Sequence, residues 1–294
     1  MLRKLALVLI LAPAILLGHT DINEIIKDLT AKIKATPTPD LYYQRATEYR
    51  ALREKDHTIE DLRAALKLDH NHRPSRIALI GELGESDEAM TLAIALYDSS
   101  QDIAQKLEGA YLVANAHRLR GNLQKALEIC ETLQELDENH STEIDLLHTD
   151  LLLSLHRPAD AAAIFKNSWK RTNSIVLRNN WIDTSLTAKQ PAEVLPLIEK
   201  EISSSRFRSS WLIRRARARL IAENKEQAHQ DLRDALTEIE VRLRPDQPDL
   251  TLIADRGLIH ALLGNEEKAK ADLKALQSSI LSPSAYRILS EQLR

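Results

Sequence analysis

The sequence has little of several residue types on which folds and sites depend. Its 294 residues include one cysteine, Cys130, seven glycines and ten prolines, and 4% of them are aromatic. A single cysteine excludes an internal disulfide and every metal site that needs a pair of cysteines. The scarcity of glycine, proline and aromatic residues excludes a collagen-like chain and an all-β fold.

Charge of one sign is also missing. The chain has 40 Lys and Arg against 43 Asp and Glu, a formal net charge of −3 at pH 7. Net charge therefore gives no reason to expect nucleic acid as a partner, and any charged function must come from a local patch. The chain is 44% hydrophobic and 28% charged. Its frequent Ala, Leu, Glu, Lys, Arg and Gln residues favour helices around a substantial core.

Motifs for catalysis or phosphate binding are absent from the sequence. There is no Gly-rich phosphate loop, no G-x-S-x-G and no H-E-x-x-H, so we predict no catalytic residue, no cofactor and no metal site. The segment Asp69-His70-Asn71-His72 is interpreted as a solvated loop. His148 and His156 would lie about 12 Å apart along a helix, too far to share one ion. Cys130 is interpreted as a small buried apolar residue. The three tryptophans are interpreted as packing residues: Trp169, Trp181 and Trp211.

The first 18 residues differ from the rest of the chain. Arg3 and Lys4 precede the uncharged run Leu5 to Gly18. This pattern predicts a secretory signal peptide, and the run is too short to span a bilayer comfortably. We expect cleavage after Gly18, with an end at residue 20 or an uncleaved anchor as open alternatives. The chain would then be exported, most simply to the periplasm, or held at the membrane by this segment.

A period of about 34 residues organises the remainder. Seven repeats begin at Pro39, Arg73, Leu107, Thr142, Ile175, Ser209 and Leu250. Place twenty of the repeat is occupied by Thr58, Leu92, Ala126, Ala161, Val194, Ala228 and Ala269. Place twenty-four is apolar in all seven, with Leu62, Leu96, Cys130, Phe165, Ile198, Leu232 and Leu273. The pattern predicts that both places lie in the core.

The turns of the repeat are also recognisable. Gly121-Asn122 and Gly264-Asn265 occupy the same two places, and Pro158 and Pro191 follow one place later. Glycine permits a left-handed turn after one helix, while asparagine and proline suit the start of the next. Each repeat is therefore predicted to be a helix, a tight turn and a second helix.

Three repeats depart from this pattern. Gly81 and Gly84 fall within the predicted first helix of the second repeat and are expected to fray or bend it. Pro196 is expected to kink the second helix of the fifth repeat. The insert from Val241 to Pro248 predicts a lengthened second helix in the sixth repeat, followed by a loop.

The residues Ala46, Tyr49, Ala65 and Leu66 in DLYYQRATEYRALREKDHTIEDLRAALKLDHN, with GNLQKALEICETLQELDEN further on, resemble the tetratricopeptide repeat. The resemblance covers about residues 39–283. It implies an all-α fold, a right-handed superhelical solenoid of antiparallel helix pairs. The expected order is a capping helix within residues 19–38, the array over 39–281 and a second capping helix over 282–294, since a stack must cover its apolar ends.

In that family the first helix of each repeat lines a concave groove. By resemblance the groove would show Tyr43, Thr47, Arg50, Tyr111, Asn115, Arg118, Asp150, Asn179, Asp183, Arg214 and Arg217. Arg214 and Arg217 are the first candidates for contact with a ligand carboxylate. The alternative is that Asp183 and Glu223 neutralise these arginines on a solvated face.

The function expected from these observations is that of an exported, non-catalytic scaffold. Its groove would bind a protein or peptide partner, with no nucleic acid and no membrane span unless the N-terminal segment stays uncleaved. A different possibility is an accessory protein of an envelope enzyme. Another is a weak metal-binding protein, because His19 would become the mature N-terminus and could chelate copper.

Overall fold

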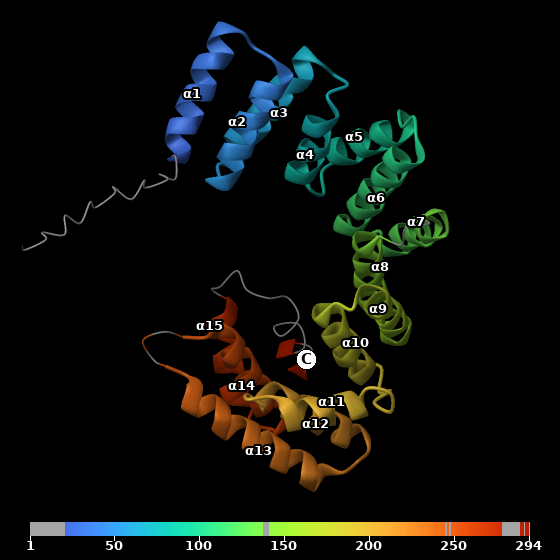
Figure 1. The fold of residues 1–294 in the computed structure, drawn as a ribbon, viewed down its shortest axis with the longest axis vertical. Coiled ribbons are helices and arrows are strands. Elements are labelled where there is room, and N and C mark those ends of the chain that lie inside the picture. The colour runs from blue at the N-terminus through green and yellow to red at the C-terminus, as the bar shows by residue number, and fades with distance from the viewer. Residues whose placement is uncertain are drawn as a thin grey trace, which may run out of the picture. The chain divides into compact units, whose positions relative to one another are not determined.

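The structure of the protein, a computed structural model, describes residues 21–137, 141–244, 246, 248–277, 289–290 and 292–293. Every regular element over these ranges is a helix, so the predicted all-α fold is confirmed (Figure 1). The chain forms two compact units, Met1–Ile129 and Cys130–Arg294, and each is treated by itself. The predicted signal peptide and His19 lie outside the described residues.

The N-terminal unit is a row of helices in which each of the first five packs on the next. They are α1 (Ile22–Ala35), α2 (Pro39–Ala51), α3 (Lys55–Leu68), α4 (Arg73–Leu83), α5 (Asp87–Asp98), α6 (Ile103–Leu119) and the beginning of α7 (Leu123–Leu136). Helix α1 precedes the first repeat and packs on α2, with Leu29 and Ile33 buried. Asp21 caps this helix by accepting a hydrogen bond from the backbone N–H of Asn23. Helices α2 and α4, which open two successive repeats, also contact each other.

The C-terminal unit continues the same arrangement. Its further helices are α8 (Thr142–Ser154), α9 (Pro158–Thr172), α10 (Ile175–Thr187), α11 (Leu195–Ser204), α12 (Ser209–Ile221), α13 (Lys225–Arg242), α14 (Leu250–Leu262) and α15 (Glu266–Gln277). The first helices of successive repeats contact one another, α10 with α12 and α12 with α14. The inner row of first helices is therefore present within this unit.

One backbone turn closes the first helix in most repeats. Place fifteen has a positive φ in Arg53, Gly121, His156, Lys189, Glu223 and Gly264. In repeat 3, for example, the N–H of Gly121 donates to the carbonyl of Arg118 and the N–H of Asn122 to that of His117. This pair of bonds satisfies carbonyl groups that the helix end would otherwise leave unpaired. The predicted left-handed turn is confirmed at both glycines, and four L-residues adopt the same strained conformation.

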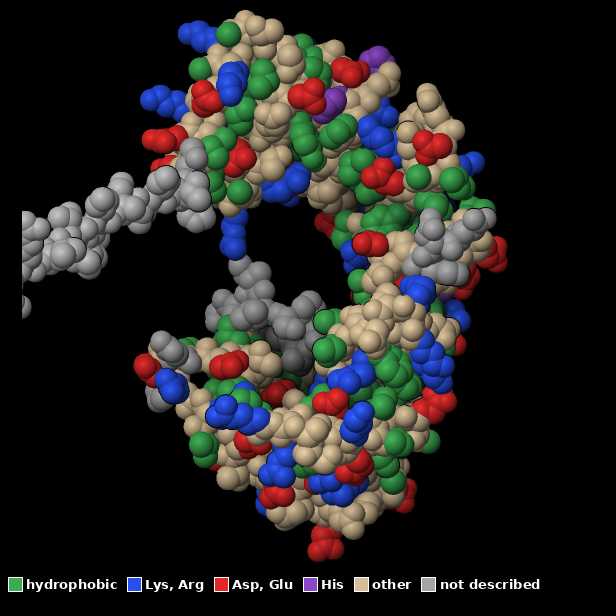
Figure 2. Space-filling view, in the orientation of Figure 1, with side chains coloured by type: hydrophobic (Ala, Val, Ile, Leu, Met, Phe, Trp, Pro, Cys, Tyr) green, Lys and Arg blue, Asp and Glu red, His purple; other side chains and the backbone are tan. Residues whose placement is uncertain are grey.

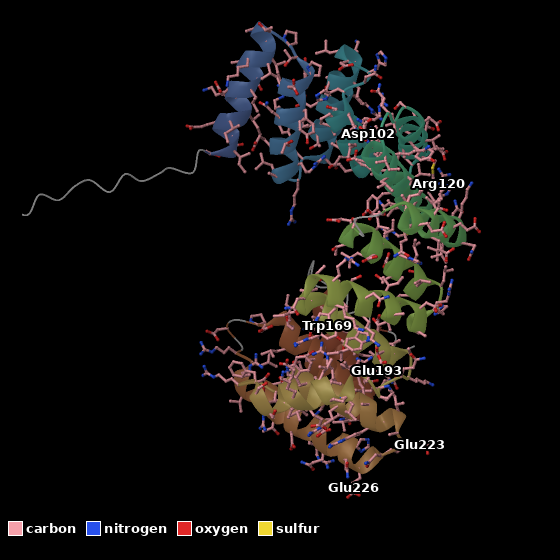
Figure 3. All side chains as sticks on the ribbon, turned by 45° about the vertical axis from the view of Figure 1, so that its right-hand side comes forward. Asp102, Arg120, Trp169, Glu193, Glu223 and Glu226 are labelled. Atoms are coloured by element: carbon pink, nitrogen blue, oxygen red, sulfur yellow. The ribbon has the colours of Figure 1, made fainter. Side chains whose placement is uncertain are left out.

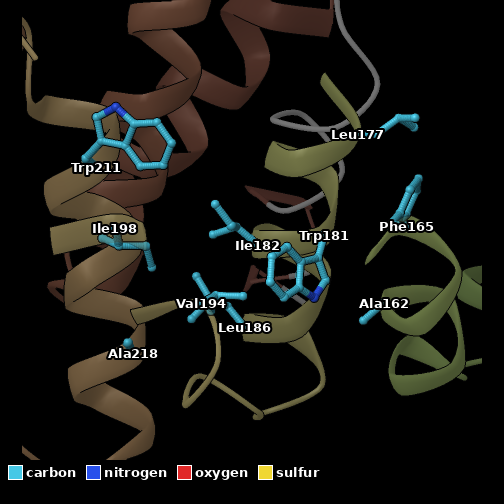
Figure 4. Close-up of a cluster of buried hydrophobic side chains, with 10 residues drawn as sticks. All are labelled: Ala162, Phe165, Leu177, Trp181, Ile182, Leu186, Val194, Ile198, Trp211 and Ala218. Atoms are coloured by element: carbon cyan, nitrogen blue, oxygen red, sulfur yellow. The ribbon is translucent and has the colours of Figure 1, made fainter. Parts of the chain in front are cut away.

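The core follows the repeat. All residues at place twenty-four are buried except Leu273, which is half-buried. Cys130 is among the buried residues, as predicted. Figure 4 shows part of the core of the C-terminal unit, where Phe165 packs with Trp181 and Ile198 in one cluster. At the other end of this unit Leu289 is fully buried beside Ala269 and Ile253.

Two of the expected departures from the pattern were wrong in their details. Helix α4 ends at Leu83, so Gly84, with φ of 61°, terminates the helix and does not lie inside it as expected. Helix α11 begins at Leu195, so Pro196 lies in its first turn, where its missing N–H removes no hydrogen bond of the helix, and not in the helix interior as expected. The lengthened helix of the sixth repeat is confirmed, since α13 reaches Arg242.

A recurrent ion pair that was not predicted from the sequence joins the two helices of three repeats. Place seven carries arginine and place twenty-three aspartate, sixteen residues later. The pairs are Arg45–Asp61, Arg215–Asp231 and Arg256–Asp272. In each, Nε and Nη2 of the arginine donate to the two carboxylate oxygens over 2.6–3.1 Å. We call this bidentate pair the clasp, and all three aspartates are buried.

Candidate functional site

Two of the predicted groove residues, Tyr43 and Arg50, line a cavity of about 390 Å³ in the N-terminal unit. Its walls come from helices α2, α4 and α6. The lining residues are Tyr43, Arg50, Arg73, Pro74, Ile77, Ala78 and Glu108. The first helices of three successive repeats therefore build this cavity, as expected for the inner face of the array.

Charged side chains of both signs stand around the cavity. Nε of Arg50 donates to Oε1 of Glu82 over 2.7 Å. On the α6 side, Arg73 donates to Oε2 of Glu108 over 2.5 and 2.9 Å. The ring of Tyr43 meets the ring of His72 edge to face, with centroids 6.0 Å apart. Each arginine is thus paired with a glutamate, and the rim presents neither sign in excess.

The floor of the cavity is a stripe of small and apolar residues along α4. Pro74, Ile77 and Ala78 line the cavity, and Gly81 continues the same helix face, since residues three and four apart share a face. A Cβ atom added at Gly81 would meet nothing within 4 Å. Space above this face is therefore open. Gly81 was expected only to weaken the helix, but in the structure it also leaves this face of α4 bare.

The other predicted residues of this unit do not line the cavity. Thr47 is exposed, and its hydroxyl donates to the carbonyl of Tyr43 one turn earlier over 3.0 Å. Tyr111, Asn115 and Arg118 are half-buried on α6. Nε of Arg118 donates to Oδ1 of Asn115 over 3.0 Å.

In the C-terminal unit the leading candidates, Arg214 and Arg217, are brought together by Asp183. Arg214 forms a bidentate pair with this carboxylate, with Nε–Oδ1 at 2.9 Å and Nη2–Oδ2 at 2.7 Å. Nη1 of Arg217 adds a third contact to Oδ1 at 3.2 Å. The side chains of Arg214 and Arg217 are 16% and 12% exposed. Most of their hydrogen-bonding capacity is directed into the protein.

Glu223, the other residue expected to neutralise these arginines, does not do so. It lies at the turn between α12 and α13 (Figure 3), and no ion pair joins it to either arginine within the described part of the chain. Neutralisation therefore falls to Asp183, which belongs to the preceding repeat.

The electrostatics agree with this arrangement. Burial opposes the charged form of Asp183, but Arg214 and Arg217 outweigh it and hold the pKa of that carboxyl below its usual value. The pKa of Arg214 is raised, because attraction to Asp183 exceeds the cost of burial. Burial raises the pKa of Asp255 to about 6, and Arg214 offsets only part of that effect. Arg214 thus lies in the field of two carboxylates.

Arg217 also lines a second cavity, of about 560 Å³. Helices α10, α12 and α14 contribute most of its wall, which includes Leu186, Leu220, Leu262, Lys189 and Gln292. The two remaining predicted residues lie elsewhere. Asp150 is exposed on α8, and Asn179 is half-buried on α10 with Oδ1 enclosed and unbonded in the described structure.

The residues set aside as non-functional can also be placed. Burial raises the pKa of the Cys130 thiol to about 12, which does not suit a nucleophile. Trp169 stacks on Trp181 with ring centroids 5.1 Å apart. Nδ1 of His148 lies 2.7 Å from Oε1 of Gln134. No group of three or more His, Cys, Asp or Glu residues suited to a metal is found among the described residues.

In the view of Figure 2, Lys and Arg side chains are interspersed with Asp and Glu over both units. Across the part of the chain that the structure describes, no helix combines the length and the apolar character that a membrane crossing needs.

Comparisons with known proteins agree with the geometry. Residues 39–72 match the model of a family described as the tetratricopeptide repeat. A crystal structure of a tetratricopeptide repeat protein from Parabacteroides merdae superimposes with a TM-score of 0.58 at 17% identity, covering 87% of this chain and 98% of that one. A thermophilic TPR protein from Thermus thermophilus, TTC0263, gives a TM-score of 0.43 at 16% identity, covering 62% and 99%. No curated protein matches the chain.

Proposed function

We propose that the chain is a non-catalytic scaffold that binds a segment of a partner protein, because its first repeat matches the tetratricopeptide repeat and its fold is similar to that of a tetratricopeptide repeat protein. The binding site in this proposal is the inner face of the N-terminal unit. It contains the predicted residues Tyr43 and Arg50 and centres on α4.

The observation that carries the proposal is the cavity of about 390 Å³ over the bare stripe of α4. An apolar side chain of the partner would enter between Tyr43, Ile77 and Ala78. Its burial would stabilise the complex by about 1.5 to 3 kcal/mol. Backbone amides of an extended segment could reach the paired Arg50–Glu82 and Arg73–Glu108 on either side. Because both rims are balanced in charge, the partner segment is expected to be apolar at its centre rather than acidic.

Arg214 and Arg217 in the C-terminal unit are a less favourable binding site than the cavity over α4. Arg214 already directs two hydrogen bonds to Asp183. A ligand carboxylate would have to displace a partner whose own pKa is held low by the same arginines. Burying a third charged group there brings a desolvation cost that the open stripe of α4 does not impose.

The test uses a random linear peptide library displayed on phage and two variants at Gly81. Gly81→Trp fills the space above the stripe, while Gly81→Ala adds one methyl group and improves helix propensity. Peptides with a shared apolar residue should be selected on the parent. They should bind the alanine variant equally and lose at least tenfold in affinity for the tryptophan variant. Selected peptides that bind both variants equally would place the site elsewhere, and no enrichment on the parent would contradict peptide binding itself.

Export is the second part of the proposal. It is supported by Arg3 and Lys4 followed by the uncharged run Leu5 to Gly18. Mass spectrometry of the protein recovered from the periplasmic fraction should give His19 as the first residue. Recovery of the intact chain in the cytoplasm would contradict export, and intact chain in the membrane fraction would favour an anchor.

A further inference from the structure

The cavity of about 560 Å³ in the C-terminal unit has two charged residues at its mouth, one of each sign. Lys189 and Glu223 both line it and are both exposed. Each stands at place fifteen of its repeat, the left-handed turn after the first helix, with φ of 58° and 60°. The same turn geometry therefore presents the two side chains from successive repeats.

Neither charge is neutralised within the described part of the chain. No ion pair or side-chain hydrogen bond joins Lys189 or Glu223 to another described residue. The acidic residue nearest to Lys189 in sequence is Glu193, which is paired with Lys166 over 2.6 Å. Lys225 follows Glu223 but opens α13 and does not line the cavity. Both charges are therefore available to a ligand.

Behind the two charges the wall is mainly aliphatic. It is built by the first helices of three repeats, with Leu186, Leu220, Ile221 and Leu262. The third charged lining residue, Arg217, already donates to Oδ1 of Asp183 and to Oγ1 of Thr187, each over 3.2 Å. The cavity thus combines an apolar interior with one positive and one negative group at its mouth.

The separation of these two groups suits an extended polypeptide. Helices α10 and α12 contact each other, and packed helices have axes about 8 to 10 Å apart. Residues at the same place of the two repeats are separated by about this distance. In a free amino acid the two charged groups share one carbon atom and could not reach both. An extended chain advances about 3.3 Å per residue, so side chains about three residues apart could.

We propose that this cavity is a second peptide site, and that it takes an apolar side chain flanked by one acidic and one basic residue. Lys189 would pair with the acidic residue and Glu223 with the basic one. The apolar side chain would enter between Leu220 and Leu262. The cavity over α4 offers no such charges, because its two arginines are already paired with glutamates. The two sites therefore select different segments.

The test selects peptides from a random linear library on phage against the Gly81→Trp protein, in which the space over α4 is filled. The outcome is thereby independent of peptide binding at α4. Enriched peptides should carry an apolar residue together with an acidic and a basic residue about three places apart. Replacement of the apolar residue by serine should weaken binding about tenfold or more. No enrichment, or enrichment of peptides that lack either charge, would overturn the proposal.

Glycine variants in the same background remove the mouth charges without harm to the turn, because glycine adopts a positive φ most readily. Lys189→Gly and Glu223→Gly should each weaken the selected peptides by about two- to fivefold, the range of an exposed ion pair, measured by fluorescence anisotropy. The matched control is Arg53→Gly, which removes a charge at place fifteen of the first repeat, where φ is 62°. It should bind as before, and an equal loss there would contradict the assignment.

A charge exchange tests the polarity of the site. Lys189→Glu combined with Glu223→Lys keeps the net charge and the composition. The selected peptides should bind this variant more weakly, while peptides with their acidic and basic residues exchanged should bind it more tightly than they bind the Gly81→Trp protein. If the exchanged peptides gained no affinity, Lys189 and Glu223 would not orient the ligand and the proposal would be wrong.

Discussion

Repeats 1, 6 and 7 join their two helices in a different way from repeats 2 to 5. The first group uses the clasp, with arginine at place seven and aspartate at place twenty-three. In the second group the same two places hold Leu79 and Ala95, Val113 and Ile129, His148 and Ile164, and Trp181 and Leu197. One backbone arrangement thus accepts either a buried ion pair or a mainly apolar pair. The repeat is defined by its shared core places, while the seventh place can vary if its partner varies with it.

The largest expected effect tests what both groups share. Phe165 in repeat 4 and Leu62 in repeat 1 are buried at place twenty-four. Phe165→Ala should lower the free energy of unfolding by about 3 to 5 kcal/mol and Leu62→Ala by about 2 to 5 kcal/mol, through lost burial and the cavity left behind. Urea unfolding measures both. If only one variant were destabilised, the two groups of repeats would not share the same core.

The next effect tests the clasp directly. Asp61→Ala leaves Arg45, 16% exposed, without its carboxylate and should lower the free energy of unfolding by about 3 kcal/mol. The double variant Arg45→Val with Asp61→Ile copies the pair of repeat 3. It should restore most of that stability, because an apolar pair avoids the desolvation of two charges. A double variant less stable than Asp61→Ala would show that the clasp is specific to its repeats.

A pH-dependent effect should distinguish repeat 4, which has His148 at place seven. Burial lowers the pKa of His148, and the nearby Glu131 and Asp145 do not overcome it. The unfolded chain therefore binds this proton more readily, so the histidine should reduce stability progressively as pH falls below about 6.5. Arginine at place seven stays charged throughout this range.

Thermal unfolding of the parent and of His148→Leu from pH 7.5 to pH 5 checks this expectation. The variant should lose less stability on acidification than the parent. The variant should still lose some stability as the pH falls, because burial also lowers the pKa values of His117 and His260. If the stability of parent and variant fell equally with pH, protonation of His148 would not destabilise the folded chain, and the expectation would be wrong.

The smallest effect concerns the turn that both groups share. Gly264 has φ of 78° and open space around it, so Gly264→Ala should cost about 1 kcal/mol through backbone strain alone. His156 adopts φ of 58° at the same place. His156→Gly should therefore raise the free energy of unfolding by about 0.5 to 1 kcal/mol, since relief of strain exceeds the added entropy of the unfolded chain. Chemical denaturation resolves changes of this size, and the opposite sign at His156 would refute the strain argument.

Much of the fold could be predicted because the period repeats seven times. Places twenty and twenty-four stay small or apolar, and Gly121 and Gly264 mark a turn that only a left-handed residue can make. Each of these signals lies within a short stretch of sequence, so it can be recognised without knowledge of the tertiary structure. The clasp was missed because Arg45 and Asp61 lie sixteen residues apart and the same pairing occurs in only three of the repeats.

The sequence by itself determined the helices, their pairing into repeats and the places that form the core, because each depends on residues close together in the chain. Only the tertiary structure decided which polar residues are available. Arg214 is engaged by Asp183, thirty-one residues away on the neighbouring first helix. Gly81 leaves the inner face of α4 open beside a cavity that three repeats build together. Whether a side chain can contact a ligand depends on the residues that face it from neighbouring helices. The order of residues along one helix does not specify those neighbours.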